Sequence, residues 1–231
     1  MSNFKKLIGH NYIFNNLVNL YNNNNLPNKL ILSGKKGIGK SLFAKHFLNY
    51  IFSLNEDYKY DLKNFQINIL NKSNILLENN SHPNVYKIYK KKDNKNIEIS
   101  QIREMNEFQN FSSFNNKLRF VIIDDLENLN LNSANSLLKS IEEPNDNLFF
   151  ILINNTSSKI PETIKSRCIE FKLFLIQKDI KLIVNNYFND NIYDEISKDF
   201  NNFYISPSFI ISLIIFAKNK NIDYKNLSIE N

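Results

Sequence analysis

The octapeptide GKKGIGKS, residues 34–41, constrains the fold of this chain more than any other stretch. It fits the spacing G-x-x-x-x-G-K-[ST] and stands between a β-favouring run (30–32) and a helical pattern, as this motif requires. The glycines allow the backbone to wrap a phosphate with its N–H groups pointing inward, and the helix N-terminus adds positive charge. The chain has four glycines and three of them fall here, which disfavours an accidental match in a turn. The motif predicts a nucleotide-phosphate site.

Two side chains of this motif carry specific chemistry. Lys40 is expected to neutralise charge on the β- and γ-phosphates, and the Ser41 hydroxyl is expected to bind Mg²⁺. The predicted cofactor is therefore ATP or ADP with Mg²⁺. The predicted nucleotide-binding residues are Gly34, Gly37, Ile38, Gly39, Lys40, Ser41 and Leu42.

A second polar site is predicted where the run FVII, residues 120–123, meets two aspartates. Four apolar residues without alternation indicate a strand buried on both faces, as in parallel sheets. A carboxylate after such a strand lies at the edge where α/β proteins bind ligands. Asp124 is therefore predicted to hold Mg²⁺ together with Ser41. An ordinary strand end would be an equal alternative without the nearby phosphate motif.

The run LFFILI, residues 148–153, predicts another buried strand, which ends in Asn154, Asn155 and Thr156. A polar side chain there could contact the γ-phosphate or the attacking water, so Asn154 is a candidate sensor of the nucleotide. Asn is abundant throughout the chain, and composition alone therefore adds little support to this interpretation.

Strands that alternate with helices around such a motif predict a three-layer α/β nucleotide-binding domain over residues 1–174. Only helical patterns follow, at about 178–187, 192–200 and 207–219, and they predict a small all-helical lid over 175–231. Residues 54–80 are Asn-rich and weakly periodic, so we interpret them as a poorly specified excursion.

Composition limits the location and the partners of the chain. No apolar core of a signal peptide is present near the N-terminus, and the most apolar stretch, 209–217, is too short to cross a bilayer. A single cysteine, Cys168, excludes an internal disulfide and a cysteine-rich zinc module. A cytoplasmic protein is predicted. The net charge of +6 suits an acidic partner such as nucleic acid, although the lysines are mostly scattered.

Several further motifs together make the chain resemble the AAA+ subunits of clamp loaders, most closely the delta-prime type of bacterial DNA polymerase III. The resemblance covers almost everything from Leu7 to about Ala217, and its last two motifs are highly specific. The motifs are LPNKL at 26–30, SHPN at 81–84, Ile102-Arg103, ANSLLKSIEEP at 134–144 and IPETIKSRC at 160–168.

The resemblance implies that Arg167 is an arginine finger, which acts in trans on the nucleotide of a neighbouring subunit. Arginine occurs only at 103, 119 and 167, and lysine, the common cation of this chain, lacks the planar fork of donors that a finger needs. A helix-terminal arginine that binds carbonyls is the alternative for Arg167. For Arg119, at a strand start, a structural role is preferred. The implied partners are other subunits of a ring, a sliding clamp and primed DNA, with no membrane.

Three departures from the family pattern affect the expected activity. The second acid after the strand is Asp125, where active members have Glu, so Asp125 is expected to be a weak catalytic acid. The segment 205–209 lacks the lid arginine of many hydrolysing members, and no zinc-binding cysteines occur between residues 50 and 82. Nucleotide binding with weak or no hydrolysis is therefore expected, without zinc. The chain is also expected to lack the family's C-terminal collar.

Three functions remain open at this point. The first is an accessory subunit that helps to load a sliding clamp on primed DNA. The second is a motor ATPase of the gamma/tau kind, which Asp125 and Phe209 disfavour. The third is a structural ring member that no longer uses nucleotide, which the intact Gly39-Lys40-Ser41 disfavours.

Overall fold

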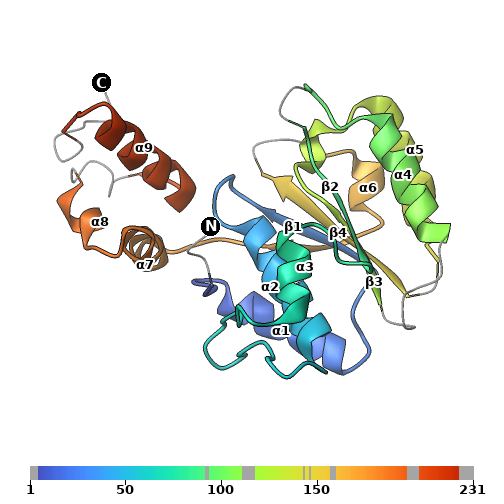
Figure 1. Ribbon diagram of the computed structural model, residues 1–231. Coiled ribbons are helices and arrows are strands. Elements are labelled where there is room, and N and C mark those ends of the chain that lie inside the picture. Colours follow the sequence, from blue (N-terminus) through green and yellow to red (C-terminus); the bar gives the residue numbers. More distant parts are fainter. Residues whose placement is uncertain are drawn as a thin grey trace.

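A parallel β-sheet forms the centre of the protein (Figure 1). The computed structural model describes residues 5–91, 94–110, 118–142, 144–145, 147–156, 160–196 and 203–223. The five strands of the sheet have the order β2-β3-β4-β1-β5, and every neighbouring pair is parallel. The strands are β1 (Lys29–Gly34), β2 (Val85–Ile88), β3 (Arg119–Ile123), β4 (Leu148–Asn155) and β5 (Ile169–Lys172).

Helices cover both faces of the sheet, because its central strands are apolar on both faces. Alternate residues of β1, β3 and β4 enter two separate hydrophobic clusters, as the two-residue period of a strand requires. One cluster includes α1 (Asn11–Asn22) and α2 (Lys40–Ser53). The other includes α4 (Ile99–Asn110), α5 (Leu131–Glu142) and α6 (Glu162–Lys165). The predicted three-layer α/β architecture is confirmed.

The strand register brings the carboxyl ends of three strands to one edge. Gly34, the last residue of β1, pairs with Asn155, the last residue of β4. Ile123, the last residue of β3, pairs with Leu152, and Asp124 follows directly. The phosphate motif, Asp124 and the end of β4 are therefore neighbours although they lie far apart in the sequence.

The segment 54–80 is more ordered than the predicted excursion. It contains α3 (Lys72–Glu78), whose N-cap Asn71 accepts a hydrogen bond from the backbone N–H of Asn74 at 2.7 Å. Tyr60 is buried, stacks on Phe14 with 5.5 Å between ring centroids, and lies 2.9 Å from His46 Nδ1 through its hydroxyl. Asparagine caps helices well, but in a chain so rich in Asn a capping residue cannot be recognised by its type.

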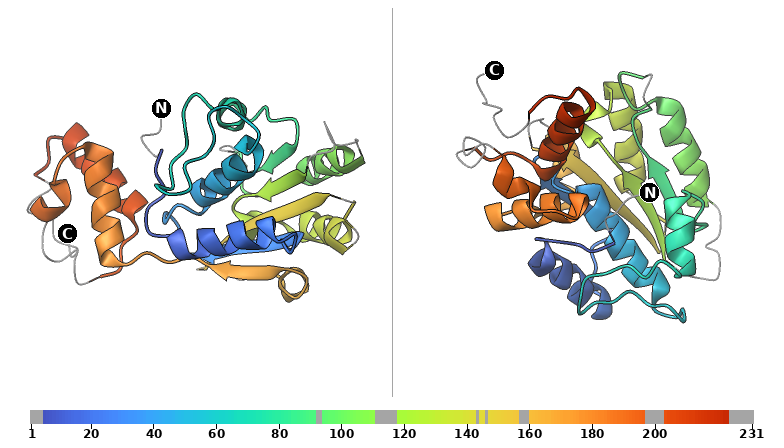
Figure 2. Two further views of the ribbon diagram at one scale, coloured as in Figure 1. Left: turned by 90° about the horizontal axis from the view of Figure 1, so that it is seen from below. Right: turned by 60° about the vertical axis from the view of Figure 1, so that its left-hand side comes forward.

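Within the described residues, three helices follow β5: α7 (Gln177–Phe188), α8 (Ile192–Glu195) and α9 (Pro207–Asn219). They lie beside the α/β layers (Figures 1 and 2) and are joined to them by a short link after β5. Helix α8 is shorter than the predicted 192–200, because the backbone at Ile196 is extended; residues 197–200 lie outside the described part. Across the described residues, none of the helices combines the length and apolarity needed to cross a membrane.

Candidate nucleotide-binding site

The phosphate motif forms a tight loop between β1 and α2. Gly37 and Gly39 adopt positive φ values of 83° and 92°, a region that other residues enter at a cost. Space is also short, since a Cβ on Gly37 would lie 2.6 Å from Ser206 Oγ. Gly39 is the N-cap of α2, so Lys40 and Ser41 begin the helix. The sequence thus places glycine where the chain turns left-handed and where another segment approaches the loop closely.

Lys40 is held inside this loop. Its ammonium group donates to the carbonyl oxygens of Gly34 and Lys35, both at 2.8 Å, and to Asn155 Oδ1 at 2.7 Å. Only 5% of the residue is exposed. Burial lowers the pKa of Lys40 to about 8, against the opposing effect of nearby carboxylates, Glu127 first among them. A buried cation surrounded by carbonyl dipoles is well suited to meet the negative charge of a phosphate.

Ser41 and Asp124, the two predicted magnesium ligands, lie in direct contact. The Ser41 hydroxyl donates to Asp124 Oδ2 at 2.5 Å, from the first turn of α2 to the end of β3. Hydroxyl, carboxylate and phosphate oxygens are the hard ligands that Mg²⁺ prefers. The side chains present therefore fit a magnesium ion that also contacts phosphates.

Asp125 and Asn154 differ in how they relate to this site. Asp125 adopts a left-handed conformation, with φ of 55°, and borders the cavity next to the phosphate motif. Asn154 was the predicted sensor, but the residue beside Lys40 is Asn155, and Asn154 is not among the residues that line the cavity. Successive side chains of a strand point to opposite faces, so a one-residue difference moves the amide to the other side of the sheet.

Sequence reasoning also missed Glu127. It lies in a single 3-10 turn, Leu126–Asn128, directly after Asp125, and its carboxylate accepts from the side-chain amide of Asn155. A third acid soon after an aspartate pair was a visible signal. Nothing in the sequence, however, indicates that the turn directs this acid toward the end of β4.

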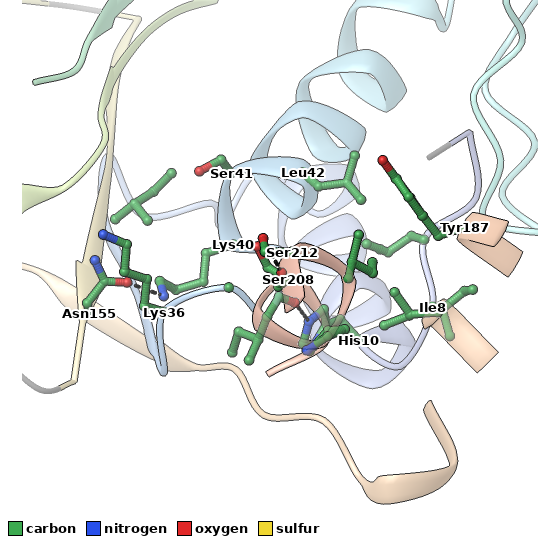
Figure 3. Close-up of a pocket in the computed structure, with 18 of the residues that line it drawn as sticks. Ile8, His10, Lys36, Lys40, Ser41, Leu42, Asn155, Tyr187, Ser208 and Ser212 are labelled. Carbon is green, nitrogen blue, oxygen red and sulfur yellow. Dashed lines mark hydrogen bonds between the residues drawn. The ribbon is translucent and has the colours of Figure 1, made fainter. Parts of the chain in front are cut away.

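The cavity at this edge has a polar end and an apolar end (Figure 3). Its volume is about 640 Å³, within the usual range for small-molecule sites. Lys40, Ser41 and Asn155 lie at one end, and Ile8 and Tyr187 lie at the other. Of the seven predicted nucleotide-binding residues, six line the cavity: Gly37, Ile38, Gly39, Lys40, Ser41 and Leu42. Gly34 contributes its carbonyl to Lys40 instead.

The segment before α1 and the helix α9 close the cavity. His10 Nε2 lies 2.9 Å from the carbonyl oxygen of Ile38, and burial lowers the pKa of His10. The Ser208 N–H, in the first turn of α9, donates to the Gly37 carbonyl at 3.3 Å. The α7–α9 helices therefore touch the phosphate loop directly. Phe209, at the position that matches the family's lid arginine, is 58% exposed and lacks a charge for phosphate.

Arg167 lies away from this cavity, at the end of α6. Its guanidinium donates to the carbonyl oxygen of Thr163 at 2.9 Å and pairs with Glu142 of α5 at 2.8 Å. The carbonyl contact is the one that the helix-terminal alternative describes. Arg119, by contrast, is 5% exposed and donates to the carbonyl oxygens of Phe108 and Gln109. Those contacts are structural, as expected.

A parallel sheet with helices on both faces, a phosphate loop after β1 and an acid after β3 define a P-loop protein of the AAA+ class. A similar fold occurs in RuvB of Thermotoga maritima, the Holliday junction branch migration motor, with a TM-score of 0.50 and 16% identity. The match covers 96% of this chain and 68% of that one.

The sequence narrows this class to one family. The family described as DNA polymerase III, delta subunit, matches residues 9–176, and the chain belongs to it. The chain is 34% identical to DNA polymerase III subunit gamma/tau of Mycoplasma genitalium over 78% of its own length. It is 33% identical to subunit delta' of Buchnera aphidicola (Schizaphis graminum) over 66% of its length. It spans 29% and 47% of these two relatives, respectively. The clamp-loader resemblance is confirmed.

Proposed function

We propose that the chain binds ATP or ADP with Mg²⁺ in the cavity beside α2. The observation that carries this proposal is the meeting of Lys40, Ser41 and Asp124 at one edge of the sheet. Lys40 would contact the phosphates, and Ser41 and Asp124 would hold Mg²⁺, which neutralises phosphate charge when bound. The apolar end of the cavity, near Ile8 and Tyr187, suits the flat face of a base.

We further propose that the protein is a clamp-loader subunit of the delta-prime type. Its family and its relatives, which include delta' and gamma/tau subunits of DNA polymerase III, support this role. In this role it joins other subunits in a ring and helps to place a sliding clamp on primed DNA in the cytoplasm. Residues 1–174 act as the nucleotide-binding domain and 175–231 as a lid. Arg167 is the finger offered to a neighbouring subunit.

Hydrolysis by the chain alone is expected to be weak. The Asp125 side chain is one methylene shorter than the glutamate of active members, and Phe209 supplies no charge to the phosphates. The second candidate function, a motor ATPase of the gamma/tau kind, is favoured by the 34% identity to a gamma/tau subunit. The amount of ATP turned over by the purified chain separates the two candidates.

The test measures ADP and ATP binding by calorimetry with Mg²⁺ present. Lys40→Ala removes a charge-assisted contact worth about 1.5–3 kcal/mol, so affinity is expected to fall by roughly 10- to 150-fold. Lys139→Ala, on the exposed face of α5, is the matched control and should bind like the wild type. Equal affinity in wild type and Lys40→Ala, or no binding at all, would contradict the proposal and favour a structural ring member.

The same preparations are then assayed for phosphate release. Turnover near background is expected for the wild type, and Asp125→Glu alone should not raise it, because the lid arginine is also missing. Robust steady-state turnover by the wild-type chain would favour the gamma/tau candidate.

A further inference from the structure

Glu127 has a defined place next to the phosphate loop, although no step of the proposed function uses it. Its carboxylate accepts two hydrogen bonds from Asn155, one from the side-chain amide and one from the backbone N–H, the latter at 3.3 Å. The turn that carries Glu127 is fixed in position, because Leu126 is buried and the Ile97 N–H donates to the Asn128 carbonyl at 2.9 Å. Glu127 therefore approaches Asn155 from a rigid support.

The chemistry of these groups allows only one orientation of the Asn155 amide. An ionised carboxylate only accepts hydrogen bonds, so the NH₂ group of Asn155 must face Glu127. An ammonium group only donates, so the amide oxygen must face Lys40, and the two lie 2.7 Å apart. The opposite orientation would place the amide NH₂ against the ammonium and the amide oxygen against the carboxylate. Both contacts would then be repulsive.

Glu127 forms a better hydrogen bond to the Asn155 amide than Asp125 does. Asp125 Oδ1 lies 3.4 Å from Asn155 Nδ2, at the outer limit of a hydrogen bond. Glu127 contacts the same nitrogen closely and also holds the backbone of Asn155. Of the two acids, Glu127 determines which way the amide points.

We propose that Glu127 is a positioning residue for nucleotide binding: through Asn155 it holds the Lys40 ammonium in the phosphate loop. The inference rests on the proposed nucleotide site. Glu127 itself is not among the residues that line the cavity. Its effect is to present the amide oxygen of Asn155 to Lys40, so that the lysine is already ordered when a phosphate arrives. Preorganisation of this kind lowers the entropy lost on binding.

The experiment is a double-mutant cycle on ADP affinity, measured by calorimetry with Mg²⁺ on the full chain. Glu127→Leu and Asn155→Leu are each expected to weaken ADP binding by about 5- to 10-fold, the size of one ordinary hydrogen bond and less than the effect of Lys40→Ala, because both residues act only through the order of Lys40. Because Glu127 acts through Asn155, the double variant should bind about as weakly as Asn155→Leu alone. Thermal unfolding checks that each variant is folded, and Glu127→Ala replaces Glu127→Leu if the latter does not fold.

Two further variants separate positioning from charge. Glu127→Gln keeps an oxygen that can accept from the Asn155 amide, so it should bind ADP within about twofold of the wild type. Asp125→Asn removes a neighbouring charge with little effect on the amide, and measures the effect of charge alone. An effect of Glu127→Leu no larger than that of Asp125→Asn would overturn the inference. So would additive effects in the cycle, or Glu127→Gln as weak as Glu127→Leu.

The failure of this inference differs from failure of the proposed function. If the wild type binds ADP and Lys40→Ala does not, the nucleotide site stands whatever Glu127 does. If the wild type does not bind ADP, the nucleotide site and the role of Glu127 are both rejected.

Discussion

The phosphate loop (34–41) and the α5–α6 edge, where Arg167 at the end of α6 pairs with Glu142 of α5, hold their cations in opposite ways. Lys40 is 5% exposed and donates to three oxygens of its own chain. The Arg167 side chain is 39% exposed, and its contacts are one carbonyl oxygen of its own helix, the neighbouring Ser166 hydroxyl and one surface carboxylate. In the first arrangement the cation is buried, and groups of this chain accept its hydrogen bonds. The second leaves a charged group at the surface in contacts that water or another ligand can replace, as a residue acting on another subunit requires.

The largest expected effect tests this difference directly. In a complex reconstituted with the gamma/tau subunits and the clamp of the same organism, Arg167→Ala should slow ATP turnover stimulated by clamp and DNA. Arginine fingers contribute about 10³–10⁵ in rate in the best-studied systems, and a ring with several sites will show less, because only one interface is changed. Arg167→Lys should be nearly as slow, since it keeps the charge and loses the fork.

Lys178→Ala, at an exposed lysine of α7 outside the family motifs, is the control for this experiment and should leave turnover unchanged at matched assembly. The isolated Arg167→Ala chain should bind ADP like the wild type, because Arg167 does not line the cavity. Normal turnover of the assembled Arg167→Ala complex would reject the role in trans. A clear loss of thermal stability in the isolated variant would support the helix-terminal alternative.

The same contrast separates what the sequence could predict from what it could not. The phosphate loop, the buried strands and the Ser41–Asp124 contact follow from local patterns, because a parallel sheet brings strand ends together. The sequence could not show that Asn155, and not Asn154, faces Lys40, because an unbroken apolar run shows which residues are buried and not which face each one takes. The contact between Glu127 and Asn155 depends on a left-handed turn at Asp125, and no local sequence pattern predicts that turn.

A second prediction concerns the buried cation and its pH dependence. Burial lowers the pKa of Lys40 to about 8 in the free protein, and a bound phosphate would raise it, so binding favours the protonated lysine. ADP affinity is therefore expected to be constant below about pH 8 and to fall by up to about tenfold per pH unit above it. The groups that face Lys40 are Glu127, Asp124 and Asp125, with Lys36 opposing them.

Calorimetry between pH 7 and 9.5 measures this dependence, with Lys40→Ala as the reference that cancels the titration of other groups. The fall should be absent in Lys40→Ala. A wild-type profile parallel to that of Lys40→Ala would show that Lys40 stays protonated throughout, as an exposed lysine does. Burial would then not distinguish the behaviour of Lys40 from that of the exposed Arg167.

The smallest effect is expected at the exposed cation's own partner, Glu142. The ion pair between Glu142 and Arg167 joins side chains that are 48% and 39% exposed, and surface pairs of this kind are worth roughly 0.2–1 kcal/mol. Glu142→Gln should therefore change the free energy of unfolding by less than about 1 kcal/mol and leave ADP affinity unchanged.

In the reconstituted complex, turnover of the Glu142→Gln variant should change far less than that of Arg167→Ala, because the Thr163 carbonyl still orients the guanidinium. Denaturant unfolding and turnover of the two variants, measured side by side, check both expectations. Destabilisation beyond about 2 kcal/mol would mean that the α5–α6 edge depends on this pair for its structure, and Arg167 would then be a structural residue like Arg119.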